Sequence, residues 1–396
     1  MELPRLDILL YAHDGRGLGH ASRTIAIGMA LRRVAPELRV LFVSGCKVSQ
    51  ELIGRVPLDW LKLPSYETEV VGGKSRGIVG NSMFSDLELG ELRGANLEQI
   101  VRLYRPRLVL ADHTPQGKHR ELLPALHSSA VIETRWVLGI RGVVGAVPQA
   151  RSELAAQIFM DHYRDILWYG DEEVLGGEHL ALVRTQYGVE PMTCGYVSRV
   201  KELQYWRTTT DDDAPSFAGI VSVPWLGEYS LGFLQSLAEA LRIVGPDHGE
   251  WKLFIESGPS ASLQVEVQSL FASLEYCRLQ PLSGAEYLRS LSQSRSAVIY
   301  GGYNSIMDVL AEQIPAVVVL RGMQDNEQQL HLTKLLAAAG EQLKVVEEHR
   351  VEGSRLAAML LAILAKAGHC QHTVNLDGAE RAAEQLIELL STKLFS

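Results

Sequence analysis

Short apolar runs alternate with longer stretches of helical period along this chain, which is the pattern of α/β domains built on parallel sheets. In the first half, the apolar runs predict strands at residues 6–11, 38–44, 58–63, 108–111 and 165–169. A helix is predicted at residues 21–34, where small and branched apolar residues recur at helical spacing. Arg32 and Arg33 fall outside that apolar face, so we expect them to point away from the sheet.

A polar segment at residues 195–216 separates the two halves of the pattern. It contains a run of Thr and Asp at 208–213 and the helix-breaking Pro215, and we interpret it as the linker between domains. Beyond it the pattern predicts strands at residues 217–223, 251–256, 297–300, 316–320 and 342–346. The predicted helices lie near residues 230–244, 284–294, 305–313, 326–339 and 353–367. A last helix at 378–394 has one apolar face, so it must pack on another element.

The length of 396 residues, at roughly 150 residues per domain, suits two such domains. The predicted boundaries are an N-terminal domain at 1–200, a linker at 201–216, a second domain at 217–375 and a C-terminal helix at 376–396. The sequence therefore predicts two doubly wound parallel-sheet domains in tandem.

Composition narrows the class of protein. Apolar residues make up 46% of the chain and charged residues 21%, as in an ordinary folded protein. The 38 Lys and Arg against 47 Asp and Glu give a net charge of −9, which argues against a general binder of nucleic acid or of anionic membranes. A local basic site is compatible with this balance.

The four cysteines and the chain's start bear on location. Cys46, Cys194, Cys277 and Cys370 form no Cys-x-x-Cys pair, so neither a zinc cluster nor a disulfide framework is indicated. The N-terminus lacks the features of a signal peptide, and no apolar run reaches the roughly 18 residues of a membrane span. We therefore expect a cytoplasmic protein without an integral membrane segment, and a peripheral visit to a membrane stays open.

A glycine-rich loop follows the first strand, where parallel sheets bind ligands. Gly15, Gly17 and Gly19 are spaced by two and are followed by His20, so the dinucleotide fingerprint is not satisfied and an NAD site is disfavoured. A histidine at a helix start has its proton affinity lowered by the helix dipole, which suits a neutral general base. The alternative is a loop histidine that caps its own helix, and spacing alone does not choose between the two.

A second loop leaves the same edge of the first sheet at Asp112 and His113. Asp112 could orient His20 as the carboxylate of an Asp–His pair. The alternative is an aspartate that starts a turn before Pro115. His113 is a weaker candidate for either role.

The strongest local signal lies in the second half, where the strand at 297–300 leads into Gly301 and Gly302 and then a helix that begins near Asn304. The glycines leave the helix N-terminal amides open to an anion the size of a phosphate. Asp308, one turn further, would lie beside a ribose attached to that phosphate. The alternative is a capping box of Ser305 and Asp308, and both readings can hold together.

Amides and carboxylates gather after the strand at 316–320. Glu327 and Gln328 could bind sugar hydroxyl groups, although an ordinary polar helix N-terminus has the same composition. The run Asp211–Asp213 lies in the predicted linker and is interpreted as a solvated charge run, so we predict no metal site.

Taken together, these motifs resemble a GT-B glycosyltransferase. The resemblance is carried by Gly17-Leu-Gly-His20-Ala-Ser-Arg23, by Gly301-Gly302-Tyr-Asn-Ser305 and by Glu327-Gln328. The chain is most similar to the peptidoglycan N-acetylglucosaminyltransferase group and to related predicted bacterial glycosyltransferases. Further matches to the latter lie at residues 111–117, 137–141, 166–170, 194–196 and 375–379.

The resemblance implies two Rossmann-like domains that face a central cleft, with the acceptor on the first and a nucleotide sugar mainly on the second. It also implies that the final helix crosses back to the N-terminal domain. His20 matches the family histidine that acts on the acceptor hydroxyl or lies beside the group that does, and Gly17, Gly19 and His113 fall in the loops that would meet the acceptor. No cofactor and no metal are implied, because helix amides offset the charge on the departing diphosphate.

In the second domain, the resemblance makes Gly301, Gly302, Asn304 and Ser305 the diphosphate site. It makes Asp308 the ribose contact, and it makes Glu327 and Gln328 the donor-sugar contacts.

Two stretches depart from the family pattern. Asp14 and Arg16 interrupt the first glycine loop, so the identity of the acceptor is not carried over. Pro224 and Trp225 stand where the family commonly has a small Gly/Ser loop, which affects the details of donor binding. We also expect residues 70–80 and the stretch through Asn96 to line the acceptor site as a flexible loop.

The sequence thus predicts a metal-independent glycosyltransferase that moves a sugar from a nucleoside diphosphate, with a UDP-sugar as first expectation. The acceptor would be a hydroxyl or amine on a small or lipid-linked molecule. His20, oriented by Asp112, would deprotonate it. Two alternatives stay open, which are a sugar-nucleotide hydrolase of the same fold and a noncatalytic nucleotide- or carbohydrate-binding subunit. An epimerase of UDP-N-acetylglucosamine shares the architecture, but less of its residue pattern is present.

Overall fold

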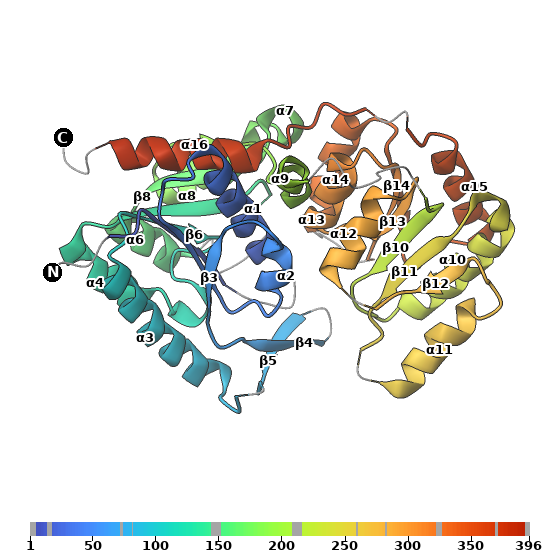
Figure 1. Ribbon diagram of the computed structural model, residues 1–396, viewed down its shortest axis with the longest axis horizontal. Coiled ribbons are helices and arrows are strands. Elements are labelled where there is room, and N and C mark those ends of the chain that lie inside the picture. Colours follow the sequence, from blue (N-terminus) through green and yellow to red (C-terminus); the bar gives the residue numbers. More distant parts are fainter. Residues whose placement is uncertain are drawn as a thin grey trace. The chain divides into compact units, whose positions relative to one another are not determined.

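The protein is described by a computed structural model in which two compact units are seen (Figure 1). Unit 1 comprises Met1–Leu203 and Asn375–Ser396, and unit 2 comprises Gln204–Val374. The structure describes residues 5–13, 18–71, 74–80, 82–143, 152–207, 216–258, 260–281, 283–321, 327–368 and 371–392. For residues 68–71, 74–76 and 327–330 it describes the backbone alone.

Unit 1 is built on a seven-stranded parallel sheet of order β3-β2-β1-β6-β7-β8-β9. Its strands are β1 (Ile8–Ala12), β2 (Val40–Ser44), β3 (Asp59–Lys62), β6 (Leu108–Asp112), β7 (Arg135–Arg141), β8 (Tyr163–Tyr169) and β9 (Met192–Thr193). β1 is fully buried and pairs in register with β2 on one side and β6 on the other, so that Ile8 lies opposite both Val40 and Leu108. The chain order reverses between β1 and β6, and a crevice that can bind a ligand forms outside the strand ends at such a point.

The helices of unit 1 follow the predicted alternation. They are α1 (Gly19–Val34), α2 (Ser49–Ile53), α3 (Asp86–Tyr104), α4 (Leu123–Ser129), α6 (Glu153–His162), α7 (Glu172–Leu175), α8 (Gly177–Tyr187) and α16 (Gly378–Ser391), while α9 (Arg199–Trp206) runs across the boundary into unit 2. Local chemistry sets where they begin: α3 starts with a capping box in which Ser85 N–H donates to Glu88 Oε2 at 2.8 Å and Ser85 Oγ accepts from Glu88 N at 3.4 Å.

The stretch expected to be a flexible acceptor loop is largely regular structure, so that part of the prediction is wrong. β4 (Glu67–Val71) and β5 (Lys74–Ile78) form an antiparallel hairpin in which Val71 lies opposite Lys74. The signal was present, because two glycines between runs that can form strands favour a hairpin. Asn96 lies within helix α3.

The last helix packs on the first helix of the same unit (Figure 1). Ala379, Ala382, Ala383 and Leu386 of α16 are buried. The guanidinium of Arg33 on α1 binds Glu202 Oε1 at 3.0 Å and Glu380 Oε2 at 3.2 Å, so it contacts both α9 and α16. A helix covered on two sides leaves little of its surface for solvent.

Unit 2 is built on a six-stranded parallel sheet of order β12-β11-β10-β13-β14-β15. Its strands are β10 (Gly219–Val223), β11 (Trp251–Ile255), β12 (Cys277–Leu279), β13 (Ala297–Tyr300), β14 (Ala316–Leu320) and β15 (Leu343–Glu347). Its helices are α10 (Ser230–Val244), α11 (Ala261–Phe271), α12 (Gly284–Ser292), α13 (Tyr303–Ala311), α14 (Glu327–Ala339) and α15 (Gly353–Leu364). The order reverses between β10 and β13, as it does in unit 1, so both units have Rossmann-like topology.

The core of unit 2 lies between the sheet and the pair α10 and α15. Phe233, Leu237 and Leu241 of α10 recur at helical spacing and pack in one cluster with Leu356 and Leu360 of α15. The predicted fold class of two parallel α/β domains is therefore confirmed.

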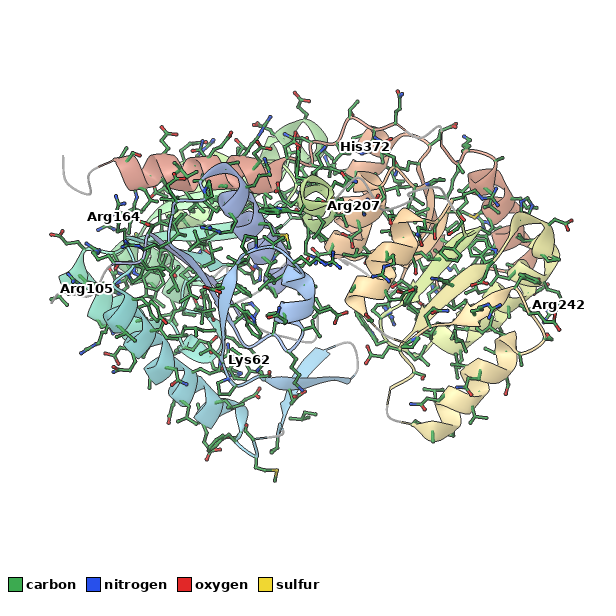
Figure 2. All side chains as sticks on the ribbon, viewed as in Figure 1. Lys62, Arg105, Arg164, Arg207, Arg242 and His372 are labelled. Atoms are coloured by element: carbon green, nitrogen blue, oxygen red, sulfur yellow. The ribbon has the colours of Figure 1, made fainter. Side chains whose placement is uncertain are left out.

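Arg207, near the start of unit 2, and His372, near its end, are labelled in Figure 2. Both contact the C-terminal end of helix α13. The guanidinium of Arg207 pairs with Glu312 at 2.5 Å, and His372 Nε2 donates to the carbonyl of Leu310 at 3.1 Å. Arg207 follows helix α9, so the predicted linker 201–216 begins as a helix, and its residues 208–215 lie outside the described part of the chain.

Among the described residues, none of the helices combines the length and the apolar character that crossing a membrane requires.

Candidate active site

The first candidate site lies where β1 and β6 end in unit 1. α1 begins at Gly19, two residues earlier than predicted, which places His20 in the first turn of that helix. Asp112 is the last residue of β6 and is only 1% exposed. Two side chains that lie 92 positions apart in sequence therefore meet at the strand ends.

His20 and Asp112 are in direct contact. Nδ1 of His20 lies 2.5 Å from Oδ2 of Asp112, and the His20 side chain is 19% exposed. A carboxylate at this distance is an acceptor, so Nδ1 carries the proton and donates it to Asp112. This leaves Nε2 as the basic nitrogen of the imidazole.

Arg23 completes the contact from the same face of α1. Its Nη2 lies 3.1 Å from Asp112 Oδ2, 3.4 Å from Oδ1 and 3.1 Å from His20 Nδ1. The Arg23 side chain is 3% exposed, so the ion pair is almost fully removed from water. Sequence reasoning did not assign Arg23 a role, although its spacing of three residues from His20 predicts a shared helix face.

The surroundings of His20 keep its imidazole neutral. Burial is the main cause that lowers the pKa of His20 well below its ordinary value, and the nearby His13, Arg23 and Arg141 lower that pKa further. The sequence attributed a low proton affinity to the helix dipole, whereas the structure assigns it chiefly to burial and to neighbouring cations. A neutral imidazole is the form that can act as a base.

Two more imidazoles stand beside His20. The ring centroid of His13, just after β1, lies 4.0 Å away, and that of His113 lies 4.9 Å away. His113 has a left-handed backbone with φ of 79°, and its buried Nδ1 has no hydrogen-bond partner among the described residues. Burial lowers the pKa of His113 well below its ordinary value, and His20 and Arg141 lower it further.

His113 thus lies beside the His20–Asp112 pair. Of the two glycines expected to face the acceptor, Gly19 is the first residue of α1, and Gly17 lies outside the described residues. Sequence reasoning singled out neither His13, which directly follows β1, nor Arg141, which ends the unpredicted strand β7.

The second candidate site is the N-terminus of α13 in unit 2. Gly302 is the N-cap and makes no side-chain cap bond, so Tyr303, Asn304 and Ser305 occupy the first turn. Ser305 is therefore inside the helix, and the alternative of a capping box between Ser305 and Asp308 does not apply. An added Cβ on Gly302 would meet only Ser305 Oγ, at 4.0 Å, so the approach to the amides is open among the described residues.

The structure describes Gly301 and Asp308 in full, whereas of Glu327 and Gln328 it describes only the backbone. Gly301 has a packing reason, because a Cβ there would lie 2.9 Å from Leu320 of the neighbouring strand. Asp308 follows Asn304 by one turn and is 8% exposed. Glu327 and Gln328 are the first two residues of α14, and their side chains lie outside the described part of the structure.

Arg321, directly after β14, is a residue that the sequence analysis did not assign. Its guanidinium carbon lies 4.4 Å from the ring centroids of both Trp225 and Tyr300, and Nη2 donates to the Trp225 carbonyl at 2.7 Å. Glu348 Oε1 accepts from Tyr300 Oη at 2.7 Å and lies 3.8 Å from Arg321 Nη1. Trp225, which departs from the family pattern, is therefore held at the strand ends by a cation between two aromatic rings.

No group of three or more His, Cys, Asp or Glu side chains within the described ranges is arranged to hold a metal ion. The run Asp211–Asp213 lies outside those ranges.

Comparisons with known proteins show the fold. No family model matches the chain, and no curated protein matches it. Among solved structures, UDP-GlcNAc 2-epimerase of Neisseria meningitidis bound to UDP-GlcNAc has a TM-score of 0.61 at 10% identity, covering 98% of this chain and 100% of that one. The glycosyltransferase SnogD of Streptomyces nogalater has a TM-score of 0.55 at 15% identity, covering 98% and 99%. MurG of Acinetobacter baumannii has a TM-score of 0.50 at 12% identity, covering 98% and 99%.

These similarities extend over nearly the whole length of each chain. The protein therefore has the GT-B fold, and the resemblance to GT-B glycosyltransferases seen in the sequence is confirmed at the level of fold. Enzymes of two reaction types share this fold, so the reaction has to be argued from the site.

Proposed function

We propose that this chain is a metal-independent glycosyltransferase that moves a sugar from a nucleoside diphosphate to a hydroxyl or amine. The first expectation for the donor is a UDP-sugar, in keeping with the UDP-GlcNAc named for one structural neighbour. In this proposal unit 1 binds the acceptor and unit 2 binds the nucleotide.

The observation that carries the proposal is the contact between His20 Nδ1 and Asp112 Oδ2 at 2.5 Å. It fixes the imidazole with its proton toward Asp112 and leaves Nε2 to accept a proton from the acceptor. As Nε2 becomes protonated, the buried carboxylate stabilises the imidazolium that forms. An acceptor hydroxyl thereby becomes a better nucleophile toward the anomeric carbon, and the nucleoside diphosphate leaves.

The uncapped first turn of α13 supports the donor half of the proposal. The helix N-terminus presents backbone amides and the positive end of the helix dipole, both of which favour a diphosphate. We propose that these amides, with Arg321 nearby at the end of β14, offset the charge that develops on the departing diphosphate. Asp308 is proposed to bind the ribose, and Glu327 and Gln328 the donor sugar.

The donor site is tested with Gly302→Val. The backbone of Gly302, with φ of −74° and ψ of 145°, accepts a side chain, and only Ser305 Oγ lies within 4.0 Å of the added Cβ. The variant should fold normally while its side chain covers the amides. Wild-type protein with a nucleoside diphosphate such as UDP at ~100 times its dissociation constant should gain about 2.7 kcal/mol of stability, which is measured as a rise in melting temperature. The same shift in Gly302→Val would contradict the proposed diphosphate site.

The catalytic role is tested with His20→Ala. Turnover should fall by about 10²–10⁴-fold, the usual contribution of a general base, while the diphosphate-induced thermal shift persists. Undiminished turnover would remove His20 from the reaction. Added chelator should leave the wild-type rate unchanged.

The same assay decides between the transferase and its alternatives. Release of the nucleoside diphosphate from a sugar nucleotide should depend on an added acceptor. Release at full rate into water alone would identify a hydrolase, and a changed configuration of the unreleased sugar, seen by NMR, would identify an epimerase. Absence of any response to nucleotides would favour the noncatalytic binding protein.

A further inference from the structure

Asp112 is shared between two partners on helix α1. Its Oδ2 lies 2.5 Å from His20 Nδ1 and 3.1 Å from Arg23 Nη2, and Arg23 also reaches Oδ1 at 3.4 Å. Asp112 and Arg23 are 1% and 3% exposed, so their charges are compensated by each other rather than by water.

We propose that Arg23 is a positioning residue, which pairs with Asp112 and so keeps His20 a neutral base with its proton on Nδ1. Its meaning for catalysis rests on the proposed function, whereas the coupling between the three side chains does not.

The hydrogen-bond pattern allows only one arrangement. Nδ1 of His20 lies within 3.1 Å of an Arg23 donor and within 2.5 Å of an Asp112 acceptor, and it cannot accept from the first while donating to the second. A lone pair on Nδ1 facing an ionised carboxylate would be repelled. The proton therefore stays on Nδ1, and the Arg23 N–H is directed to the carboxylate.

Charge balance supplies the second part of the argument. A buried aspartate with histidine as its only partner favours the imidazolium, because an opposite charge in contact stabilises the protonated ring. Because the positive charge of Arg23 already compensates Asp112, the carboxylate stabilises a protonated His20 less. Two other groups near His20 add to this effect, because His13 after β1 and Arg141 at the end of β7 also lower the pKa of His20.

The test measures the protonation of His20 directly, by ¹⁵N NMR of the histidine side chains of the full chain during a pH titration without substrate. A His20→Gln spectrum assigns the signals. In Arg23→Met, His20 should bind its proton about ten-fold or more tightly than in the wild type. Arg23→Lys should restore most of the wild-type behaviour, because it keeps the charge beside Asp112.

Arg32→Met is the matched control. Arg32 lies on the same helix, and its guanidinium donates to the Leu38 carbonyl at 2.7 Å. Its removal also takes one positive charge from α1, and the titration of His20 should stay unchanged. An unchanged titration of His20 in Arg23→Met, or equal effects of the Met and Lys variants, would overturn the proposal.

A wild-type measurement covers the case in which Arg23→Met fails to fold. At neutral pH the spectrum of His20 must be that of a neutral ring protonated at Nδ1. An imidazolium, or a neutral ring protonated at Nε2, would overturn the proposal without any variant.

Kinetics separate this inference from the proposed function. If sugar transfer occurs, the acid limb of the kcat/KM profile of Arg23→Met should move to higher pH, with the KM for the donor unchanged. A shifted titration of His20 without any sugar transfer would refute the proposed function and leave the coupling intact. Transfer that depends on His20 but not on Arg23 would refute the coupling alone.

Discussion

The buried pair of Arg93 on α3 and Glu121 offers a sharp test of how unit 1 is held together. Both side chains are 0% exposed, with Arg93 Nε 2.5 Å and Nη2 3.1 Å from the two carboxylate oxygens. Tyr11 at the end of β1 and Tyr66 before β4 also donate to this carboxylate, and Arg93 Nη1 donates to the Pro64 carbonyl at 2.6 Å.

Replacing Arg93 by Met leaves the Glu121 carboxylate buried without its cation. Breaking one side of a buried ion pair costs about 3–5 kcal/mol, because the remaining charge is neither paired nor hydrated. A domain of ~150–250 residues loses about 2–4 °C of melting temperature per kcal/mol, so the transition of unit 1 should fall by about 6–20 °C. The double variant Arg93→Met with Glu121→Gln has no unpaired charge and should recover much of this loss.

Differential scanning calorimetry of the full chain measures the effect. The control is Arg102→Met, which removes an exposed partner of Glu98 on the same helix, where Arg102 is 58% exposed. This control should cost under about 0.5 kcal/mol. A loss below about 1 kcal/mol in Arg93→Met, or a double variant less stable than the single one, would refute the reasoning.

Three further predictions concern packing and protonation. In Gly378→Ala the new Cβ would lie 2.5 Å from the Gly195 carbonyl oxygen, so thermal unfolding should show a loss of about 1–3 kcal/mol, whereas Gly232→Ala, with open space in α10, should gain about 0.5–1 kcal/mol. Burial raises the pKa of the Cys277 thiol to about 12, so its alkylation at mildly alkaline pH should be far slower in native than in unfolded protein, and equal rates would contradict this. Folding lowers the pKa values of His20 and His113, so below about pH 6.5 the unfolded chain binds more protons than the folded one. The free energy of unfolding should therefore decrease as the pH is lowered through this range. Melting curves of His113→Asn should show a weaker dependence on pH than those of the wild type.

Much of the fold followed from periodicity. The alternation of apolar runs and helical faces predicted two parallel α/β domains, and most of the predicted strands match the observed ones to within a few residues. Strands β7, β9 and β12, the hairpin of β4 and β5, helix α11 and the helices of unit 1 from α2 to α9 were not predicted. β12 is only three residues long and gives no long apolar signal. β7 begins at Arg135 and ends at Arg141, and the apolar run 136–140 between them is at least as long as the predicted strand at 108–111, so its signal was present in the sequence.

The sequence predicts those residues of the candidate site that directly follow the carboxyl ends of the predicted strands. His20 and Asp112 follow two apolar strands, and carboxyl ends of parallel strands meet at one edge. The sequence therefore predicts His20 and Asp112 as a pair. The predicted donor residues at the start of α13 follow a strand in the same way.

The sequence by itself determined which residues stand at the ends of strands and at the starts of helices, because apolar periodicity and glycine placement are local properties. Only the tertiary structure decided that Arg23 compensates Asp112, that Arg141 reaches the His20 site from a third strand and that Arg321 lies between Trp225 and Tyr300. Such contacts depend on strand order, register and burial, and these are fixed by packing between segments far apart in the chain. The proton affinity of His20 follows from those contacts, so the same motif in another fold would carry a different chemistry.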